Sequence, residues 1–242
     1  MKVALLSDIH SNLEAFQAVQ ASLAANQAEE IIFLGDIVGY GADPNECIAL
    51  LRNLAGSSIA GNHDFAAVDK TDIDNFNPLA GEAIVWTQKK LGAENARFLS
   101  SLPLHAVRHG FYCVHSTPMH PQLWDYIVTL KDAGVSFDNF TGPLCFVGHS
   151  HHPAIFIEDS SGKRSTAAGS AITLENDNRY IINIGSVGQP RDGNPLASYG
   201  LYDTETKKYR LIRVAYDIAA AQQKIVAAGL PPFLAARLAL GR

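Results

Sequence analysis

The amino-acid sequence predicts an α/β fold in which a sheet is covered by helices. Short apolar runs alternate with amphipathic helical patterns through the first half of the chain, and the connections between them are short. Five apolar runs end in Asp, His or Asn. Alternating strands and helices imply right-handed crossovers, so we expect the polar residues after the strands to gather at one end of the sheet.

The first strand is predicted at residues 3–6, a fully apolar run that is followed by Asp8 and His10. A helix should come next, because Ser11 and Glu14 have the spacing of a capping box. Apolar residues then recur on one helical face, at Leu13, Phe16, Val19 and Leu23.

The second strand is predicted at residues 30–34 and ends at Asp36. A Gly-rich loop over residues 38–41 follows, and Pro44 should open the next helix. This repeat of strand, loop and helix supports the α/β interpretation.

A third apolar run, residues 57–60, leads into Gly61-Asn62-His63-Asp64. Taken alone, these four residues are an ordinary turn, because Asn and Gly tolerate left-handed backbone. They become a candidate site because they follow a strand, as Asp8 and Asp36 do.

The middle of the chain continues the pattern. We expect a helix over 77–101, a hairpin of strands 104–107 and 111–114, a helix over 130–140 and a buried strand over 144–147. His115 follows the hairpin, and His149 and His151 follow the last of these strands.

After residue 151 the pattern changes to short runs separated by turns, which is typical of antiparallel strands. These runs are 154–157, 164–167, 180–184, 199–202 and 209–214. Asp217 should cap a helix over 218–226, and Pro231 should start a last one. We expect a single domain over 1–242 with a C-terminal helical extension at 217–242, which could cover a sheet or form a contact in a homo-oligomer.

Composition limits the function classes. Hydrophobic residues make up 47% of the chain and charged residues 18%, which is a globular composition. The net charge of -5 argues against extended nucleic-acid binding, although a local basic pocket stays open. No apolar run reaches the roughly 20 residues of a membrane span, so no membrane partner is expected.

The three cysteines Cys47, Cys113 and Cys145 are odd in number, widely spaced and set among apolar residues. They are interpreted as buried free thiols rather than as disulfides or thiolate metal ligands. The chain also opens on a strand pattern that is too short for a signal peptide. A reducing cytoplasm is the expected location.

The residues that follow strands form a candidate metal site: Asp8, His10, Asp36, Asn62, His63, His115, His149 and His151. Oxygen and imidazole ligands without thiolates suit Mn, Fe or Zn rather than Ca, and two ions would need about this many ligands if one carboxylate bridges them. Such a pair can hold a hydroxide for in-line attack on a phosphoryl group. Each motif alone has a plainer explanation, such as helix capping by Asp8 or a buried His115 with ordinary hydrogen bonds.

The order of the motifs is more specific than any one of them. Asp-x-His, Gly-Asp, Gly-Asn-His-Asp, a lone His and Gly-His-x-His follow one another between Asp8 and His151. This order resembles the calcineurin-like metallophosphoesterase family, in particular its small bacterial and archaeal phosphodiesterases and phosphatases. The resemblance implies the metallophosphoesterase fold, a four-layer α/β/β/α sandwich of two mixed β-sheets flanked by helices.

The resemblance also implies roles for individual residues. Asp8, His10 and His151 would bind a first metal ion, and Asn62, His115 and His149 a second, with Asp36 as the bridge. His63 would be a catalytic histidine that protonates the leaving oxygen or stabilises its charge. Asp64 would orient His63, with simple helix capping as the alternative.

Substrate contacts are less specific. Arg191, in a Gly-rich stretch after a strand, could clamp a phosphate or be an exposed turn residue. Trp124 could stack on a base or pack its own loop against the body. Tyr40, in the Gly-rich loop after Asp36, is a further candidate.

Together these observations predict a dinuclear metal-dependent phosphoesterase. Its substrate would be a small phosphodiester or a dinucleotide polyphosphate, attacked by a hydroxide that bridges two Mn, Fe or Zn ions. A phosphomonoesterase is an alternative; a protein phosphatase is disfavoured, because residues 35–41 lack the Asp and Arg that the protein-phosphatase branch carries there. A non-catalytic metal-binding scaffold is disfavoured because it would not need His63.

Overall fold

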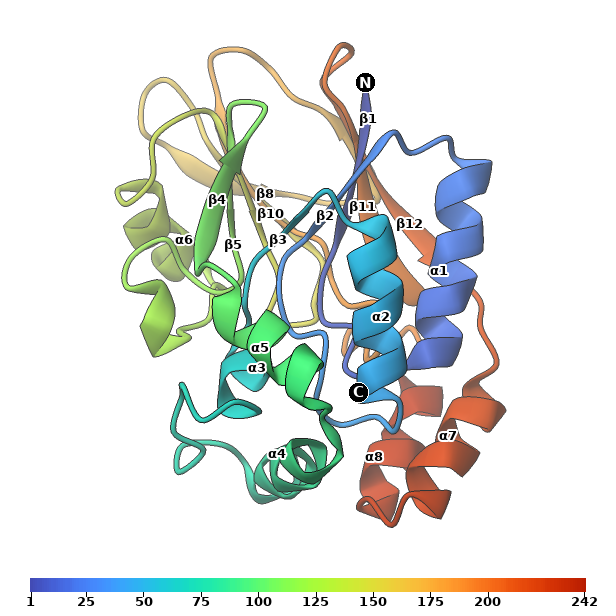
Figure 1. Ribbon diagram of the computed structural model, residues 1–242. Helices are drawn as coiled ribbons and strands as arrows, with labels where there is room; N and C mark the ends of the chain where they lie inside the picture. The colour runs from blue at the N-terminus through green and yellow to red at the C-terminus, as the bar shows by residue number, and fades with distance from the viewer.

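The computed structural model describes residues 1–242 and contains two six-stranded sheets that pack face to face, with helices on both outer faces (Figure 1). The first sheet has the order β3 (Ser57–Ser58), β2 (Glu30–Phe33), β1 (Lys2–Leu6), β11 (Ala197–Asp203), β12 (Lys208–Val214) and β9 (Ala171–Thr173). The second has the order β4 (His105–Arg108), β5 (Phe111–Val114), β6 (Leu144–Val147), β10 (Arg179–Asn183), β7 (Ala154–Glu158) and β8 (Arg164–Ala167). The expected four-layer sandwich is confirmed.

Burial on both faces explains the continuous apolar run of β1. Val3 and Leu5 pack between the two sheets. Ala4 and Leu6 point the other way, into the layer with α1 (Leu13–Ala25) and α2 (Pro44–Leu54). Successive strand residues face opposite sides, so a strand between two apolar layers has no polar face.

Both sheets are mixed. β1, β2 and β3 run parallel, and β11 joins β1 in the antiparallel direction. The strands after residue 151 pair with one another in the antiparallel direction, as expected. β10 also pairs in parallel with β6, which lies before residue 151. β9 was not expected at all. The side chains of β10 from Tyr180 to Asn183 are buried, so this strand belongs to the sheet interior and not to a surface hairpin.

The helices differ from the prediction at their ends. Asn12, not Ser11, caps α1, because its side chain accepts a hydrogen bond from the Ala15 N–H. The single helix expected over 77–101 is two, α4 (Pro78–Lys90) and α5 (Ala93–Ser101), because Leu91 and Gly92 are extended. α6 (Leu130–Phe137) is shorter than expected and covers the second sheet.

The C-terminal segment forms α7 (Ile218–Ala227), α8 (Pro232–Ala236) and a 3-10 turn, η2 (Arg237–Leu240). Asp217 caps α7 as expected. These helices pack beside α4 at the end of the sandwich where β1 and β2 finish (Figure 1). The Trp86 indole N–H of α4 donates to the Ala228 carbonyl across this contact.

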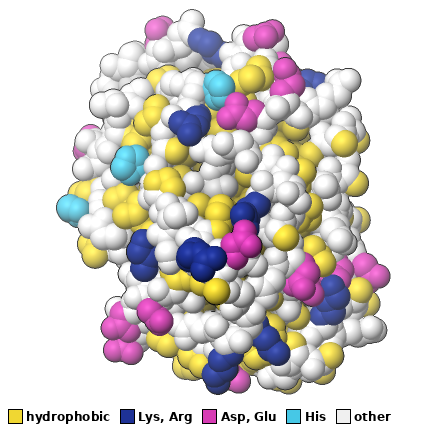
Figure 2. Space-filling model, viewed as in Figure 1, with side chains coloured by type: hydrophobic (Ala, Val, Ile, Leu, Met, Phe, Trp, Pro, Cys, Tyr) yellow, Lys and Arg dark blue, Asp and Glu magenta, His cyan; other side chains and the backbone are white.

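Three further features concern the helices, the surface and the cysteines. No helix has both the length and the apolar character needed to cross a membrane. On the face in Figure 2, basic and acidic side chains are interspersed and no large patch of one sign stands out. The cysteines Cys47, Cys113 and Cys145 are free and buried.

Candidate metal centre

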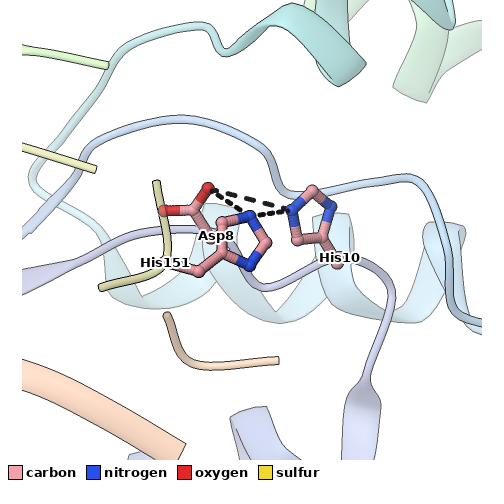
Figure 3. Close-up of side chains that lie close together, drawn as sticks. All are labelled: Asp8, His10 and His151. Atoms are coloured by element: carbon pink, nitrogen blue, oxygen red, sulfur yellow. Dashed lines mark hydrogen bonds and ion pairs between the residues drawn. The ribbon is translucent and has the colours of Figure 1, made fainter. Parts of the chain in front are cut away.

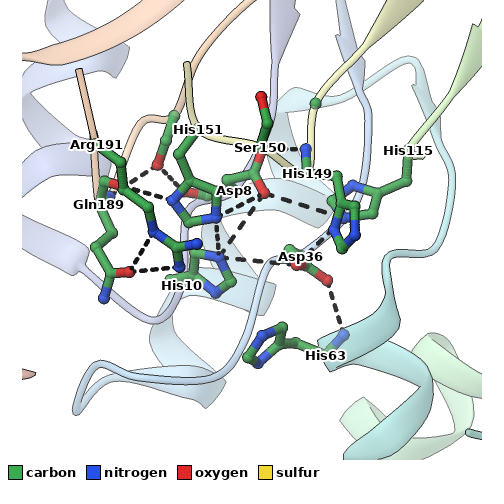
Figure 4. Close-up of polar contacts among 12 residues, drawn as sticks. Asp8, His10, Asp36, His63, His115, His149, Ser150, His151, Gln189 and Arg191 are labelled. Atoms are coloured by element: carbon green, nitrogen blue, oxygen red, sulfur yellow. Dashed lines mark hydrogen bonds and ion pairs between the residues drawn. The ribbon is translucent and has the colours of Figure 1, made fainter. Parts of the chain in front are cut away.

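The carboxyl ends of the strands bring the expected site residues together in the interior. Three groups of side chains have ligand atoms that all lie within 4.8 Å of one another. The groups are Asp8, His10 and His151 (Figure 3), then His10, Asp36 and His63, and then Asp36, His115 and His149. Figure 4 shows the groups side by side, with Asp36 between His10 and His115.

Four imidazoles are held in the same way, by one ring nitrogen on a main-chain carbonyl. The pairs are His10 Nδ1 with Val38 O at 2.9 Å, His115 Nδ1 with Leu34 O at 2.7 Å, His151 Nδ1 with Gln189 O at 2.6 Å and His149 Nε2 with Trp124 O at 2.7 Å. A carbonyl only accepts, so each of these nitrogens carries the proton. The other nitrogen of each ring is left to act as a metal ligand.

The first group fits a cation. His10 Nε2 and His151 Nε2 lie 3.1 Å apart, and both rings have their proton on Nδ1. Burial lowers the pKa of both imidazoles well below the ordinary value, so two lone pairs face each other. Asp8 Oδ1 lies 3.2 Å from His151 Nε2 and has no hydrogen-bond partner. A metal ion would satisfy all three atoms.

Asp36 belongs to the second and the third group and lies between His10 and His115 (Figure 4). Its Oδ2 is 3.2 Å from His115 Nε2 and 3.7 Å from His10 Nε2. Burial opposes ionisation, but the neighbouring imidazoles of His115 and His63 outweigh it and hold the pKa of Asp36 well below its usual range. Burial likewise opposes protonation of His115, but the Asp36 carboxylate raises the pKa of His115 to about 9. Asn62 Oδ1, buried nearby, also has no partner.

The backbone of the site is strained. Five candidate ligands have left-handed backbone, with φ of 55° at Asp8, 50° at His10, 61° at Asp36, 67° at His149 and 59° at His151. Each such residue costs on the order of 1–3 kcal/mol and persists only where the surroundings impose it. Main-chain hydrogen bonds do so here, from Asp8 N to Gly35 O at 2.9 Å and from Gly188 N to Asp8 O at 2.9 Å.

Two glycines allow this packing. A Cβ at Gly61 would overlap the Asp36 carboxylate, and a Cβ at Gly39 would overlap the His63 ring. Gly39 also has a φ of 91°, which a side chain would strain. The glycines of these motifs therefore leave room for the functional side chains.

The Gly-rich stretch after β10 has a supporting role that sequence reasoning missed. Ser186 Oγ donates to the Asp8 carbonyl at 2.8 Å, and Asn183 Nδ2 donates to the Gly148 carbonyl at 2.6 Å. The Gln189 carbonyl holds the His151 ring. The only sequence signal for this role was the position of the stretch after a strand.

Asp64 does not contact the His63 ring, so the expected orienting role is wrong. Its Oδ1 accepts the main-chain N–H of Ile37 at 2.9 Å and of Val38 at 3.2 Å, and its Oδ2 accepts that of Asp36 at 2.8 Å and of Gly61 at 3.0 Å. A carboxylate has about four lone pairs, so one that accepts four hydrogen bonds has none left for the N–H of the His63 ring. Asp64 instead caps α3 (Asn62–Ala66) and ties it to the loop after β2, which matches the capping alternative.

His63 belongs to the second group, with His10 and Asp36, and its ring also packs against aromatic side chains. Its ring centre is 4.8 Å from that of His10, 4.6 Å from that of Tyr40 and 5.0 Å from that of Phe76. Its Nδ1 has no hydrogen-bond partner. Burial lowers the pKa of His63 to about 4, so the ring is neutral near pH 7 in the absence of ligands.

Comparison with known proteins identifies the family. The model of the calcineurin-like phosphoesterase superfamily domain matches residues 1–207. The chain belongs to this superfamily. It is 45% identical over 244 residues to the uncharacterized protein MJ0912 of Methanocaldococcus jannaschii, covering 99% of this chain and 98% of that protein.

Solved structures agree with the superfamily assignment. The chain is similar to a metallophosphoesterase from Sphaerobacter thermophilus, with a TM-score of 0.89 and 41% identity over 100% of this chain and 99% of the other. Hypothetical protein PH1004 from Pyrococcus horikoshii OT3 shares the fold, with a TM-score of 0.80 and 20% identity over 100% of this chain and 98% of that one. The C-terminal helices lie beyond the superfamily match, but these full-length similarities include them.

A cavity of about 540 Å³ opens beside the ligand groups of this superfamily member, lined by Tyr40, Asn62, His63, Phe76, Trp124 and Tyr126 among others. Its size is in the range of small-molecule sites. Lys70 and Phe76 also line it, although the sequence analysis had not singled them out. Tyr126 stacks on His149, with ring centres 4.0 Å apart, and is 51% exposed.

The three residues expected to contact the substrate, Tyr40, Arg191 and Trp124, lie near the ligand groups. They differ in how strongly other contacts fix their side chains. Tyr40 packs edge-on against His10 and borders the cavity. Arg191 donates to Gln189 Oε1 and lies over the Tyr40 ring. Trp124 packs against Phe65, and its indole N–H donates to Thr71 Oγ1 at 3.2 Å, so its ring is mainly a fixed wall of the cavity.

Proposed function

We propose that this protein is a dinuclear metal-dependent phosphoesterase that hydrolyses a small phosphorylated compound, either a phosphodiester or a dinucleotide polyphosphate. The observation that carries the proposal is the pair of ligand groups that meet at Asp36, with unpartnered acceptor atoms turned inward. Membership of the calcineurin-like phosphoesterase superfamily supports the same reaction class.

In this proposal Asp8, His10 and His151 hold one ion, and Asn62, His115 and His149 hold the other, with Asp36 shared. Two bound Mn, Fe or Zn ions would supply an activated water and neutralise the phosphoryl oxygens. The protein fixes the ligands before substrate arrives, because main-chain carbonyls set the orientation of four rings.

His63 is proposed to act on the leaving oxygen. Its neutral ring needs a proton for this task, and a phosphate anion bound beside it would favour the protonated form. Its free Nδ1 and its place on the cavity wall support that role. Arg191 and Tyr40 are proposed to contact the phosphate, and the aromatic walls of the cavity to contact the rest of the substrate.

Hydrolysis of two model esters tests this function. Metal-free protein is supplied with Mn²⁺ and assayed on bis(4-nitrophenyl) phosphate and on 4-nitrophenyl phosphate. We expect turnover of the diester and a smaller rate on the monoester. The reverse preference would favour the phosphomonoesterase alternative. Absence of turnover on either ester with Mn, Fe and Zn would favour the scaffold alternative.

A further inference from the structure

Arg237 places a second guanidinium over the Tyr40 ring, which Arg191 also contacts and which borders the metal centre. The guanidinium carbon lies 5.6 Å from the centre of the Tyr40 ring for Arg191 and 6.0 Å for Arg237. The same ring lies 4.7 Å from that of His10 and 4.6 Å from that of His63. Two cations from separate parts of the chain therefore share one aromatic ring that borders the ligand groups. Figure 4 shows Arg191 beside His10 and His151.

Neither cation forms an ion pair with an Asp or Glu side chain. The arginine ion pairs of the chain are made by Arg52, Arg164, Arg179 and Arg213. Arg191 donates only to the neutral Gln189 side chain, through Nε at 3.2 Å and Nη2 at 2.8 Å. Arg237 donates through Nε to the main-chain oxygen of Arg242. Both side chains therefore keep N–H groups for a further acceptor.

The two charges also act on each other. Burial, and after it the nearby Arg191, lowers the pKa of Arg237 to about 10. Like charges that are brought together away from water raise the free energy of the folded state. An anion between them would remove this cost and would gain charge-assisted hydrogen bonds.

The position of Arg237 is set by packing. The buried Leu234 and Leu238, on either side of it in the chain, belong to one apolar cluster with Tyr40. The same cluster includes Ala80 and Ala83 of α4. The C-terminal helices thus hold this guanidinium against the loop that follows Asp36.

We propose that Arg191 and Arg237 form an anion subsite that binds a second phosphate group, linked to the one at the metal centre. This inference rests on the proposed function, which places the hydrolysed phosphate at the ligand groups. The substrate class is then a compound with at least two linked phosphates. A diester with a single phosphate would leave Arg237 without a role.

Binding of inorganic tripolyphosphate and orthophosphate to the full-length chain, loaded with Mn²⁺ and titrated with both anions as their Mn²⁺ complexes, tests the subsite by calorimetry. We expect tripolyphosphate to bind at least tenfold more tightly than orthophosphate. Arg237→Gln should weaken tripolyphosphate binding by about tenfold or more, since it removes a bidentate charged donor. The affinity of Arg237→Lys for tripolyphosphate should lie between those of Arg237→Gln and the unchanged protein. Arg52→Gln, which removes a surface arginine paired with Glu94, should bind like the unchanged protein.

Equal binding of tripolyphosphate by Arg237→Gln and the unchanged protein would overturn the inference. So would equal affinity of the unchanged protein for tripolyphosphate and orthophosphate, a comparison that needs no folded variant. Because no turnover is measured, the outcome is separate from that of the proposed function. An inactive protein that binds tripolyphosphate through Arg237 would refute the catalysis alone, and an active one without this binding would refute the subsite alone.

Discussion

Asn62 and His63 are neighbours in the chain but have different surroundings. Asn62 Oδ1 is a buried acceptor without a partner, as a metal ligand is before the ion binds. The His63 ring lies among Tyr40, Phe76 and the cavity. The first helical turn of α3 sends the two side chains in different directions.

Replacing His63 should therefore separate catalysis from metal binding. We expect His63→Asn to keep its metal content while kcat falls by about 10² or more, the usual effect of losing a general acid. Metal analysis and turnover are measured on the same sample. Asn62→Ala is the matched comparison and should lose metal. Loss of metal from His63→Asn as well would show that His63 is a ligand.

The sequence predicted which side chains gather at the candidate site, but it did not predict their backbone conformation. The motifs placed Asp8, Asp36 and His149 after strands, and the structure brings them together. Their left-handed φ values follow from hydrogen bonds to distant loops, which no local pattern reveals. For the same reason Asp64, three of whose four partners lie 26–28 residues away, was assigned the wrong neighbour.

At the scale of elements, Asp64 joins the start of α3 to the loop after β2. Asp64→Asn would leave two main-chain N–H groups facing an amide nitrogen. Each unsatisfied N–H group destabilises the folded state by about 1–3 kcal/mol. We expect the free energy of unfolding, measured in urea, to fall by about 2–6 kcal/mol.

Asp132→Asn is the matched control, because Asp132 completes an exposed capping box in α6. Asp132→Asn should lower the free energy of unfolding by about 1 kcal/mol or less. Equal losses in the two variants would contradict the joining role of Asp64.

The elements themselves were largely predictable, because their apolar periodicity is local. Pairing was not. β10 pairs with β7 in the antiparallel direction as expected, but its parallel pairing with β6 depends on contacts that the pattern of residues 179–183 does not encode. The break between α4 and α5 was also missed, since Leu91 continues the apolar pattern and only its backbone is extended.

At the scale of the whole molecule, buried histidines should make the metal-free protein sensitive to acid. Burial lowers the pKa of His63 to about 4 and of His149 to about 3, and it holds that of His10 and His151 well below normal. The unfolded chain takes up these protons near pH 6.5, so it binds more protons than the folded state below that pH.

The free energy of unfolding should therefore fall as the pH drops from 6.5 toward 4, by about 3 kcal/mol from His63 alone. His115 has the opposite sign: its pKa, raised to about 9, adds stability below pH 6.5 that is lost as the pH rises through 9. Urea unfolding with a chelator should show a maximum near pH 6.5–7. A flat profile between pH 5 and 7 would contradict this, and His63→Asn should show a shallower acid slope.

The C-terminal helices were predicted as helices, but their place was not. Their apolar faces suited a sheet cover or a dimer contact equally well. The structure packs them on α4 and on the loop that follows Asp36, which brings Arg237 to the site. This placement depends on contacts between segments more than 130 residues apart, such as Trp86 with Ala228, for which the difference is 142.

The central claim is that hydrolysis needs two ions per chain. It is tested most directly by titrating Mn²⁺ into metal-free protein while the hydrolysis of bis(4-nitrophenyl) phosphate is followed. We predict no turnover without metal and a rise that reaches its plateau at two ions per chain. A plateau at one ion per chain, or turnover that survives the chelator, would contradict the account.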